Sequence, residues 1–586
     1  NILTQFNYDA EGRNTKTIYA DNTDTETIYD SLGKAVARAD QKDRETQTDY
    51  DKMGRAYRVT YPDGRTEETT YDNEGHKLSV TESKAPEISR TTSYEYDANG
   101  RQTKVTYPDG LYSTTHYDTE GKVDYETDEQ GVTTNYSYDA AGRRTGMTRG
   151  TYSVTYGYDA NGNQTSVTDS NGTTYTDYDE LNRPYQVRYP DGSYTTTEYD
   201  KLGRKTAYVD EENKRTEYTY DCSGKLTSVK DAMNNTTTYG YDLAGNMTTQ
   251  TDAEGKITRY TYDNMNRRKT RILPEGQTEY YNTYDATGNL TSKTNFNGQS
   301  LTYTYNTITD TLMGKVVPGT GNISFTYDNF RRRKTMTDSH GTTTYDYDIR
   351  DRVISKESPN GNISYTYTNG RLSRIQSLNF PNGADMAFGY DTQGRLETVT
   401  DNKTGKITNY DYYANGNLNT CQYPNDIRTT YTYNSRNRLT NLTISNVTSS
   451  AMLKSFAYTV GTSGNRTKVV EEAGRTANWT YDNLYRLTNE TIVNDVFAIN
   501  GSVGYTYDKT GNRQTRTSTL SGVTAQDYTD AYDDNDRLLE AGYIYDNNGS
   551  TTQAEDWTYT YDAENKLKIA TNGTHTLTYV YDGDCA

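Results

Sequence analysis

Apolar and polar residues alternate along most of this chain, in runs of about six to seven residues. Many runs end in Tyr-x-Tyr, as at Tyr94/Tyr96 and Tyr218/Tyr220, and the run that follows carries one recurrent valine such as Val105. Because residues two apart share a face of a strand, one face bears Tyr and Val and the other mainly Thr and charged residues. Long stretches with the 3.6-residue apolar spacing of a helix are absent. The pattern therefore predicts an all-β chain.

Two phrases separate the runs and recur with a period of about 21 residues. The first phrase, Y-D-x-x-G-R, stands at 50–55, 96–101 and 199–204. The second phrase, P-D-G, stands at 62–64, 108–110 and 190–192. In the first phrase Asp can bond its own downstream backbone and Gly can take positive φ, which predicts a type I turn closed by a left-handed residue. In the second, Pro presets φ before another left-handed Gly. Each unit is thus a hairpin with one phrase at either end.

These turn residues are assigned a structural role. They are Asp51, Gly54, Arg55, Asp97, Gly100, Arg101, Asp200, Gly203 and Arg204 in the first phrase, and Pro62, Gly64, Pro108, Gly110, Pro190 and Gly192 in the second. The three glycines of P-D-G are expected at positive φ. The recurrent arginines are expected to pair with Asp, or to stack on Tyr of a neighbouring unit.

Tandem hairpins predict one continuous antiparallel sheet in which each unit is stabilised by its neighbours. About 28 units of two strands, spaced by about 4.8 Å, give a ribbon on the order of 270 Å long, which must twist into a spiral, tube or shell. Wound to a diameter of about 60 Å, it would make one to two turns and stay open, with unpaired strand edges at its ends. The spacing divides the array into a regular part, 1–367, and a looser continuation, 368–586, whose inserts 445–454 and 494–501 are expected to lengthen loops.

The composition indicates a thin sheet and not a thick globular core. Only 31% of the 586 residues are hydrophobic, mean hydropathy is -1.05 and formal net charge is -19, values that lean toward disorder. The 61 tyrosines, in a Thr-rich background, argue instead for strands whose side chains lie near water. An acidic chain is a poor binder of nucleic acid or anionic membrane, and no run is long and apolar enough for a membrane span. The chain begins within a repeat, which suggests a mature fragment or a piece of something longer.

The residues offer no constellation for catalysis, a metal or a cofactor, so none is predicted. Four histidines occupy ordinary repeat positions, and the recurrent Asp is explained by turn capping. The three cysteines form neither a disulfide framework nor a zinc pattern, and are interpreted as incidental thiols. The residues in question are His76, His116, His340 and His575, with Cys222, Cys421 and Cys585.

The tandem Y-D-x-x-G-R phrases resemble the YD (Rhs) repeats of bacterial Rhs and wall-associated proteins, of Tc toxin B and C subunits, and of teneurins. The resemblance covers essentially the whole chain, and it implies a β-spiral wound into a hollow shell, which in toxins encloses a C-terminal effector. The terminal phrase at 579–584 looks like one found late in Rhs shells. The family's closing D-P-x-G segment with its self-cleaving aspartates has no counterpart here, so capsule closure and autoproteolysis are not carried over.

Three functions remain open. The first is a structural wall of a secreted or surface-displayed protein, which encloses or presents another moiety such as a toxin-type effector. The second is an extracellular adhesin whose Tyr-bearing surface meets glycans or another cell. The third is a self-assembling filament or tube. The expected partners are the rest of a longer YD-repeat polypeptide or further copies of this chain, with an encapsulated effector or glycans as alternatives, and neither nucleic acid nor inserted membrane.

Overall fold

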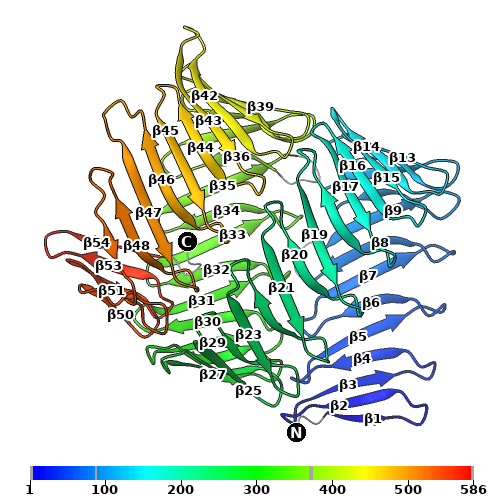
Figure 1. Ribbon diagram of the computed structural model, residues 1–586. Helices are drawn as coiled ribbons and strands as arrows, with labels where there is room; N and C mark the ends of the chain where they lie inside the picture. Colours follow the sequence, from blue (N-terminus) through cyan, green and yellow to red (C-terminus); the bar gives the residue numbers. More distant parts are fainter. Residues whose placement is uncertain (1–3, 86–88, 369–373, 582–586) are drawn as a thin grey trace.

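The chain forms a curved wall that is one sheet thick (Figure 1). The computed structural model describes residues 4–85, 89–368 and 374–581. No helix occurs among them, and 54 strands run from β1 (Gln5–Tyr8) to β54 (Thr576–Thr578). The all-β class predicted from the alternating pattern is confirmed.

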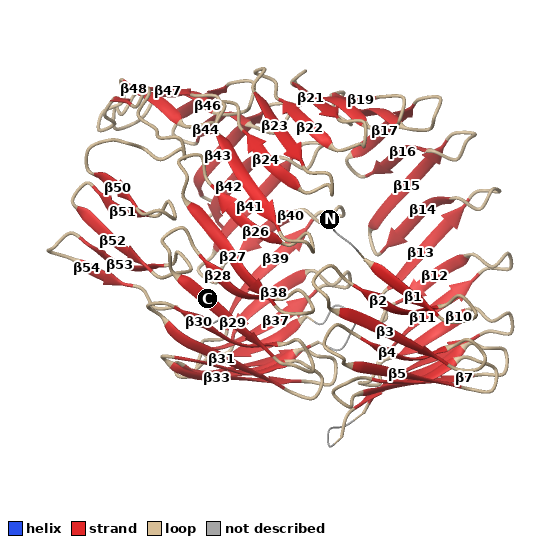
Figure 2. Ribbon diagram, turned by 90° about the horizontal axis from the view of Figure 1, so that it is seen from below, coloured by secondary structure: helices blue, strands red, loops and turns tan. Residues whose placement is uncertain are grey.

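Consecutive strands pair antiparallel, hairpin after hairpin, so the topology is that of the sequence order. The first 49 strands, to β49 (Gln526–Asp527), make one sheet, and β50 (Tyr543–Tyr545) starts a second sheet of five strands. The ladder crosses residue 367, because β35 (Gly361–Tyr367) pairs with β36 (Ile375–Asn379). Figure 2 shows from below how the wall curves. Every described strand belongs to this wall, which confirms the spiral of tandem hairpins.

The Y-D-x-x-G-R turn is the same tight loop in each repeat. Between β5 (Glu45–Tyr50) and β6 (Ala56–Thr60), the N–H of Asp51 donates to the carbonyl of Arg55 at 2.9 Å, and the N–H of Gly54 donates to the carbonyl of Asp51 at 2.8 Å. A bulge precedes Tyr50, and Gly54 has φ of 78°. Gly100 and Gly203, with φ of 75° and 82°, lie in equivalent turns. This is a type I turn closed by a left-handed residue.

The P-D-G turn at the other end of the hairpin also closes through a left-handed glycine. Gly64, Gly110 and Gly192 have φ of 81°, 83° and 83°. In each case the tyrosine before the proline supplies the closing bonds: the Gly64 N–H donates to the Tyr61 carbonyl at 2.9 Å, for example. Pro62, Pro108 and Pro190 occupy the next position of their turns. There the missing N–H of proline costs no ladder bond.

Asp and Arg of the first phrase stiffen the turn from within. The Asp51 carboxylate accepts the N–H groups of Met53 and Arg55, both at 2.9 Å, and the guanidinium Nε of Arg55 at 2.7 Å. These donors hold the pKa of the Asp51 carboxyl below its ordinary value, the Arg55 backbone N–H most strongly. The same contacts recur between Asp97 and Arg101 and between Asp200 and Arg204.

The arginine also fastens each repeat to the next one. Arg55 donates to the carbonyl of Asp72 at 2.8 Å and stacks 4.6 Å above the ring centre of Tyr71. The Tyr71 hydroxyl donates backward to the carbonyl of Ala56 at 2.8 Å. We call this unit the Arg–Tyr clasp. Arg101 stacks on Tyr117 and Arg204 on Tyr220 in the same way. The arginine therefore pairs with Asp in its own turn and stacks on Tyr in the following one.

The wall buries little. The accessible surface is 31766 Å², whereas a compact protein of 66.4 kDa would expose about 21,000 Å². The buried hydrophobic residues form only small clusters, such as Ile323, Phe325 and Met336. Stability therefore comes from hydrogen-bonded strands and clasps between neighbours more than from a core.

Two expectations about dimensions need correction. Turns that touch across the spiral lie 221 to 280 residues apart, so the 586 residues complete somewhat more than two windings rather than one to two. The estimate assumed a diameter that the sequence does not fix. Only half of the insert 445–454 is loop: its other residues extend β42 (Leu439–Asn446) and β43 (Met452–Val460), and residues 447–451 form the connection between them.

We predict that Gly110→Val destabilises its hairpin by about 1–2 kcal/mol, because a side chain at φ of 83° is strained even where nothing lies within 4 Å of the new Cβ. Hydrogen exchange across β10 (Gln102–Thr106) and β11 (Tyr112–Tyr117) measures the change. Gly110→Asn is the matched control, since Asn213 and Asn234 occupy the equivalent position at φ of 62° and 66°. Equal exchange in the two variants contradicts the assignment.

Candidate functional site: the seam between windings

The two kinds of turn meet where one winding lies on the next. The P-D-G-type turns of the earlier winding, here called the lower winding, contact the YD turns of the later winding, here called the upper winding. We call the line of these contacts the seam. It begins at Asp21, whose carboxylate lies 3.5 Å from Arg267, and continues to Gly319, whose carbonyl accepts from Lys568 at 2.7 Å. The seam joins segments that are distant in sequence, and in Figure 1 the strands near β31 (Gly321–Tyr327) lie beside those near β6.

Ion pairs hold the start of the seam. Lys42 Nζ lies 2.6 Å from both Asp285 and Asp310, and Arg44 lies 2.5 Å from Asp310. Burial raises the pKa of the Asp285 carboxyl, but the ammonium of Lys42 and nearby amides outweigh it and bring that pKa down to about 2. These carboxylates are therefore charged at neutral pH and bind their cations.

The most enclosed pair lies further along. The side chain of Glu129 is 0% exposed and that of Arg350 is 12% exposed. The guanidinium donates to both Glu129 oxygens, at 2.9 and 3.2 Å, and lies 3.2 Å from Asp109 and 4.4 Å from the ring centre of Tyr107. One arginine of the upper winding thus fills a socket made by two turns of the lower winding.

Arg436 repeats that arrangement further along the seam. Its guanidinium lies 3.6 Å above the Tyr189 ring, donates to Glu211 at 2.6 Å and donates to the Ser193 hydroxyl at 2.8 Å. Nearby, the Tyr485 hydroxyl donates to Asp210 at 2.6 Å; burial and this carboxylate raise the pKa of Tyr485.

The far end of the seam adds apolar contact. Lys315 Nζ lies 2.8 Å from Glu564, and only 9% of the lysine side chain is exposed. Beside this pair, Leu301 and Val317 of the lower winding pack with Ala563 of the upper one. The seam is therefore a continuous interface in which enclosed charges are paired across windings.

The upper winding uses one position of its turn repeatedly. With Tyr counted as the first residue of the YD turn, the fourth residue reaches the winding below. Its occupants and their partners are Phe330 with Arg90, Arg350 with Glu129, Gln393 with Thr151, Asn415 with Asn171, Arg436 with Glu211, Asn535 with Gln277, Asn548 with Asn297, and Glu564 with Lys315. The fourth position is the second x of Y-D-x-x-G-R, and its residue type differs from repeat to repeat. The residue at this position therefore determines which contact each repeat makes with the winding below.

The turn residues assigned from sequence lie on two different edges. The P-D-G turns of Gly64, Gly110 and Gly192 lie on the seam, next to Arg331, Arg350 and Arg436 respectively. The YD turns 51–55, 97–101 and 200–204 lie on the opposite edge of the first winding. Sequence reasoning did not find the seam cations or Glu129. Their only signal is a charge in a variable turn position.

The other chemically suggestive residues lie in ordinary turns and strands of the repeats. Asp72, Glu74 and His76 have ligand atoms within 4.8 Å of one another, but His76 takes the place of the usual arginine: its Nδ1 lies 2.8 Å from Asp72 and its ring stacks on Tyr96. Cys222 is exposed in a YD turn and Cys421 is buried, both with free thiols. Cys585 lies outside the described residues.

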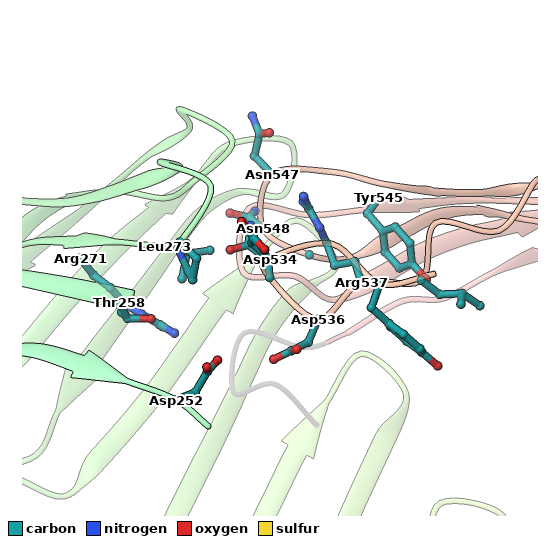
Figure 3. Close-up of a pocket in the computed structure, with 15 residues that line it drawn as sticks. Asp252, Thr258, Arg271, Leu273, Asp534, Asp536, Arg537, Tyr545, Asn547 and Asn548 are labelled. Atoms are coloured by element: carbon teal, nitrogen blue, oxygen red, sulfur yellow. The ribbon is translucent and has the colours of Figure 1, made fainter. Parts of the chain in front are cut away.

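The seam widens into a cleft of about 510 Å³ near its end (Figure 3). Asp252 and Arg271 line it from the lower winding, and Asp534, Asp536 and Arg537 from the upper winding. Its lining carries charges of both signs and consists mainly of turn residues, with Thr258, Arg271 and Tyr545 contributed by strands. The cleft therefore has the character of a gap in the interface between windings. Within the described residues, no helix is long and apolar enough to cross a membrane.

Comparison with known proteins matches two families. The RHS Repeat family model matches residues 80–112, 158–194, 220–257 and 244–278, and the Teneurin YD-shell model matches 292–406. A comparison with curated proteins gave no match.

Solved structures give the same fold. A crystal structure of TcdB2-TccC3-Cdc42 aligns with all of this chain at a TM-score of 0.70 and 13% identity, and TcdB2-TccC3 aligns at 0.65 and 14%. A Tc holotoxin pore of Photorhabdus luminescens aligns with 99% of the chain at 0.59 and 13% identity. The chain spans about two fifths of the length of these proteins, covering 40%, 38% and 38% of them. Parts of the chain therefore match the RHS-repeat and Teneurin YD-shell family models, and its spiral wall has the fold found in TcdB2-TccC3.

Proposed function

We propose that this chain is a structural section of a container, whose wall surrounds a polypeptide that other parts of the assembly supply. The observation that carries the proposal is the seam: successive windings are joined by enclosed ion pairs, so the spiral is a closed side wall and not an open ribbon. A wall of paired turns excludes macromolecules from its interior without any catalytic group. The Teneurin YD-shell match and the fold of TcdB2-TccC3 support this role.

Two finer points belong to the same proposal. The enclosed moiety is an effector-type polypeptide, and the container acts outside the cell or at its surface. The sheet is thin and buries few residues, so one of its faces can line an enclosed space while the other meets solvent. This supports an encapsulating role over a catalytic one. The proteins of similar fold span more than twice this length, which supports a container built from this section together with further segments.

Electron cryomicroscopy of the natural polypeptide that carries this chain tests the function. We expect a spiral that further repeats continue, with polypeptide density inside it that resists added protease while the wall is intact. A wall whose interior contains only solvent, or a chain whose isolated repeats turn over a substrate in its cleft, contradicts the proposal.

The container role depends on the seam, so breaking its most enclosed pair should loosen the wall. Arg350→Ala leaves Glu129 buried without a partner, and we expect a local loss of about 2–3 kcal/mol. Faster hydrogen exchange in the turns 107–111 and 347–352 measures this loss of stability.

The matched control is Arg188→Ala, since Arg188 is 49% exposed and pairs with Asp177 within one hairpin. Its expected cost is below about 1 kcal/mol. Similar effects of the two variants would remove the special role of the seam.

Acid should weaken the seam in a defined range. The pKa of Asp285 is lowered from 3.8 to about 2 in the folded protein, because Lys42 donates to its carboxylate, although burial opposes the shift. Because the pKa of Asp285 is lower in the folded than in the unfolded protein, its charged carboxylate stabilises the fold. This stabilisation is complete above about pH 4 and is lost as pH falls toward 2. We expect Asp285→Asn to cost on the order of 1–2 kcal/mol at neutral pH, after allowance for solvent screening. Denaturant titrations of both proteins should converge near pH 2, and a difference that persists there contradicts the pairing.

A further inference from the structure

The cleft of about 510 Å³ interrupts the contact between the two windings. The seam is closed on both sides of it, by Asp210 with Tyr485 before the cleft and by Lys315 with Glu564 after it. Both walls of the cleft are therefore continued by further repeats. The cleft belongs to the interior of the seam and does not arise from an end of the chain.

Arg271 departs from the charge pairing of the seam. Its guanidinium lies 5.7 Å from the ring centre of Phe296, but no residue that the structure describes accepts a hydrogen bond from it or forms an ion pair with it. The Nε atom is nevertheless shielded from solvent. Glu279, its neighbour on the adjacent strand, lies 2.7 Å from Lys293 instead. Native proteins rarely leave a shielded donor without an acceptor, so Arg271 indicates a group that the chain itself does not supply.

The facing wall offers an acceptor and a negative charge. The side-chain amide of Asn535 donates to Gln277 at 2.8 Å, whereas its Oδ1 is shielded from solvent and accepts from none of the described residues. Asp534 is exposed, and within the described ranges its carboxylate has neither a cation nor a donor as partner. Figure 3 shows Arg271 on one wall of the cleft and Asp534 on the other.

The other charged groups that line the cleft are bound within the chain. Their partners are backbone N–H groups for Asp252, Lys256 for Asp536, and Asp533 with Glu275 for Arg537. One guanidinium and one carboxylate, those of Arg271 and Asp534, therefore remain on facing walls.

We propose that the cleft binds a short zwitterionic peptide, whose carboxylate accepts from Arg271, whose N–H donates to Asn535 and whose ammonium group lies near Asp534. A carboxylate matches the planar donors of a guanidinium. A ligand with both charges suits the cleft best, since Asp534 repels a simple anion and Arg271 a simple cation. Leu273 and Leu538 add apolar contact for a side chain. Binding changes no covalent bond and does not depend on what the wall encloses.

Saturation-transfer NMR titrations of the purified chain with the peptide Gly-Leu-Gly test the proposal, at about 0.05 M salt to limit screening. We expect saturable binding with a Kd of about 1 mM or tighter. The N-acetylated peptide lacks the ammonium group and the peptide amide lacks the carboxylate. Each should bind at least about fivefold more weakly, and the doubly blocked peptide more weakly still.

Two variants assign the charges. Arg271→Gln should weaken binding of Gly-Leu-Gly at least about tenfold. Asp534→Asn should weaken binding of Gly-Leu-Gly but leave that of the N-acetylated peptide unchanged. Asp534 is exposed, so its variant tests the proposal independently of any effect of Arg271→Gln on folding, which circular dichroism measures. Arg259→Gln is the matched control, because Arg259 is exposed on the neighbouring strand β25 (Ile257–Tyr262) and lies on the opposite face of the sheet from Arg271.

Three results would overturn the proposal. The first is no saturable binding of Gly-Leu-Gly at about 10 mM, which would mean that the cleft holds solvent only. The second is equal binding of the doubly blocked peptide. The third is a folded Arg271→Gln variant that binds Gly-Leu-Gly as tightly as Arg259→Gln does.

Discussion

A sheet one layer thick has almost no core, and the rest of the structure follows from that constraint. Each hairpin must be held by its neighbours along the sheet and across the seam. Along the sheet, the Arg–Tyr clasp does this: Arg55 is fixed by Asp51 in its own turn, stacks on Tyr71 and bonds the next turn. The tyrosine ring serves because it offers an apolar face to the guanidinium and a hydroxyl to the backbone at once. A leucine has neither a π face nor a hydroxyl, which explains why tyrosine stands at the clasp position.

The hairpins could be read from the sequence because their determinants are local. An Asp that caps its own loop and a Gly at positive φ define a turn within six residues, and a period-two pattern assigns the faces of the strands. The glycines at 64, 110 and 192 have the backbone that this logic requires. The insert 445–454 shows its limit, because half of its residues lengthen a strand pair where extra length suggested a loop.

The seam could not be read in the same way. Which turns meet depends on how many hairpins complete a winding, and that number is set by small twists added strand after strand. A few degrees per strand would move Arg350 away from Glu129 to another repeat. The contact residues also sit in the variable positions of the phrase, where Phe330, Arg350 and Asn415 have nothing in common except their place in the turn. The recurrent residues of a repeat thus form the turn and the clasp, and its variable residues determine which turn of the other winding it contacts.

Zero-length carbodiimide cross-linking with mass spectrometry tests the stacking of windings most directly, because it joins carboxylates only to amines in direct contact. Lys42 should link to Asp285 and Lys315 to Glu564, pairs 2.6 and 2.8 Å apart across 243 and 249 residues of sequence. The account predicts that such links dominate at dilute protein, within single chains. Links confined to the same or adjacent repeats would contradict it, because the hairpins would then form a ribbon whose windings do not touch.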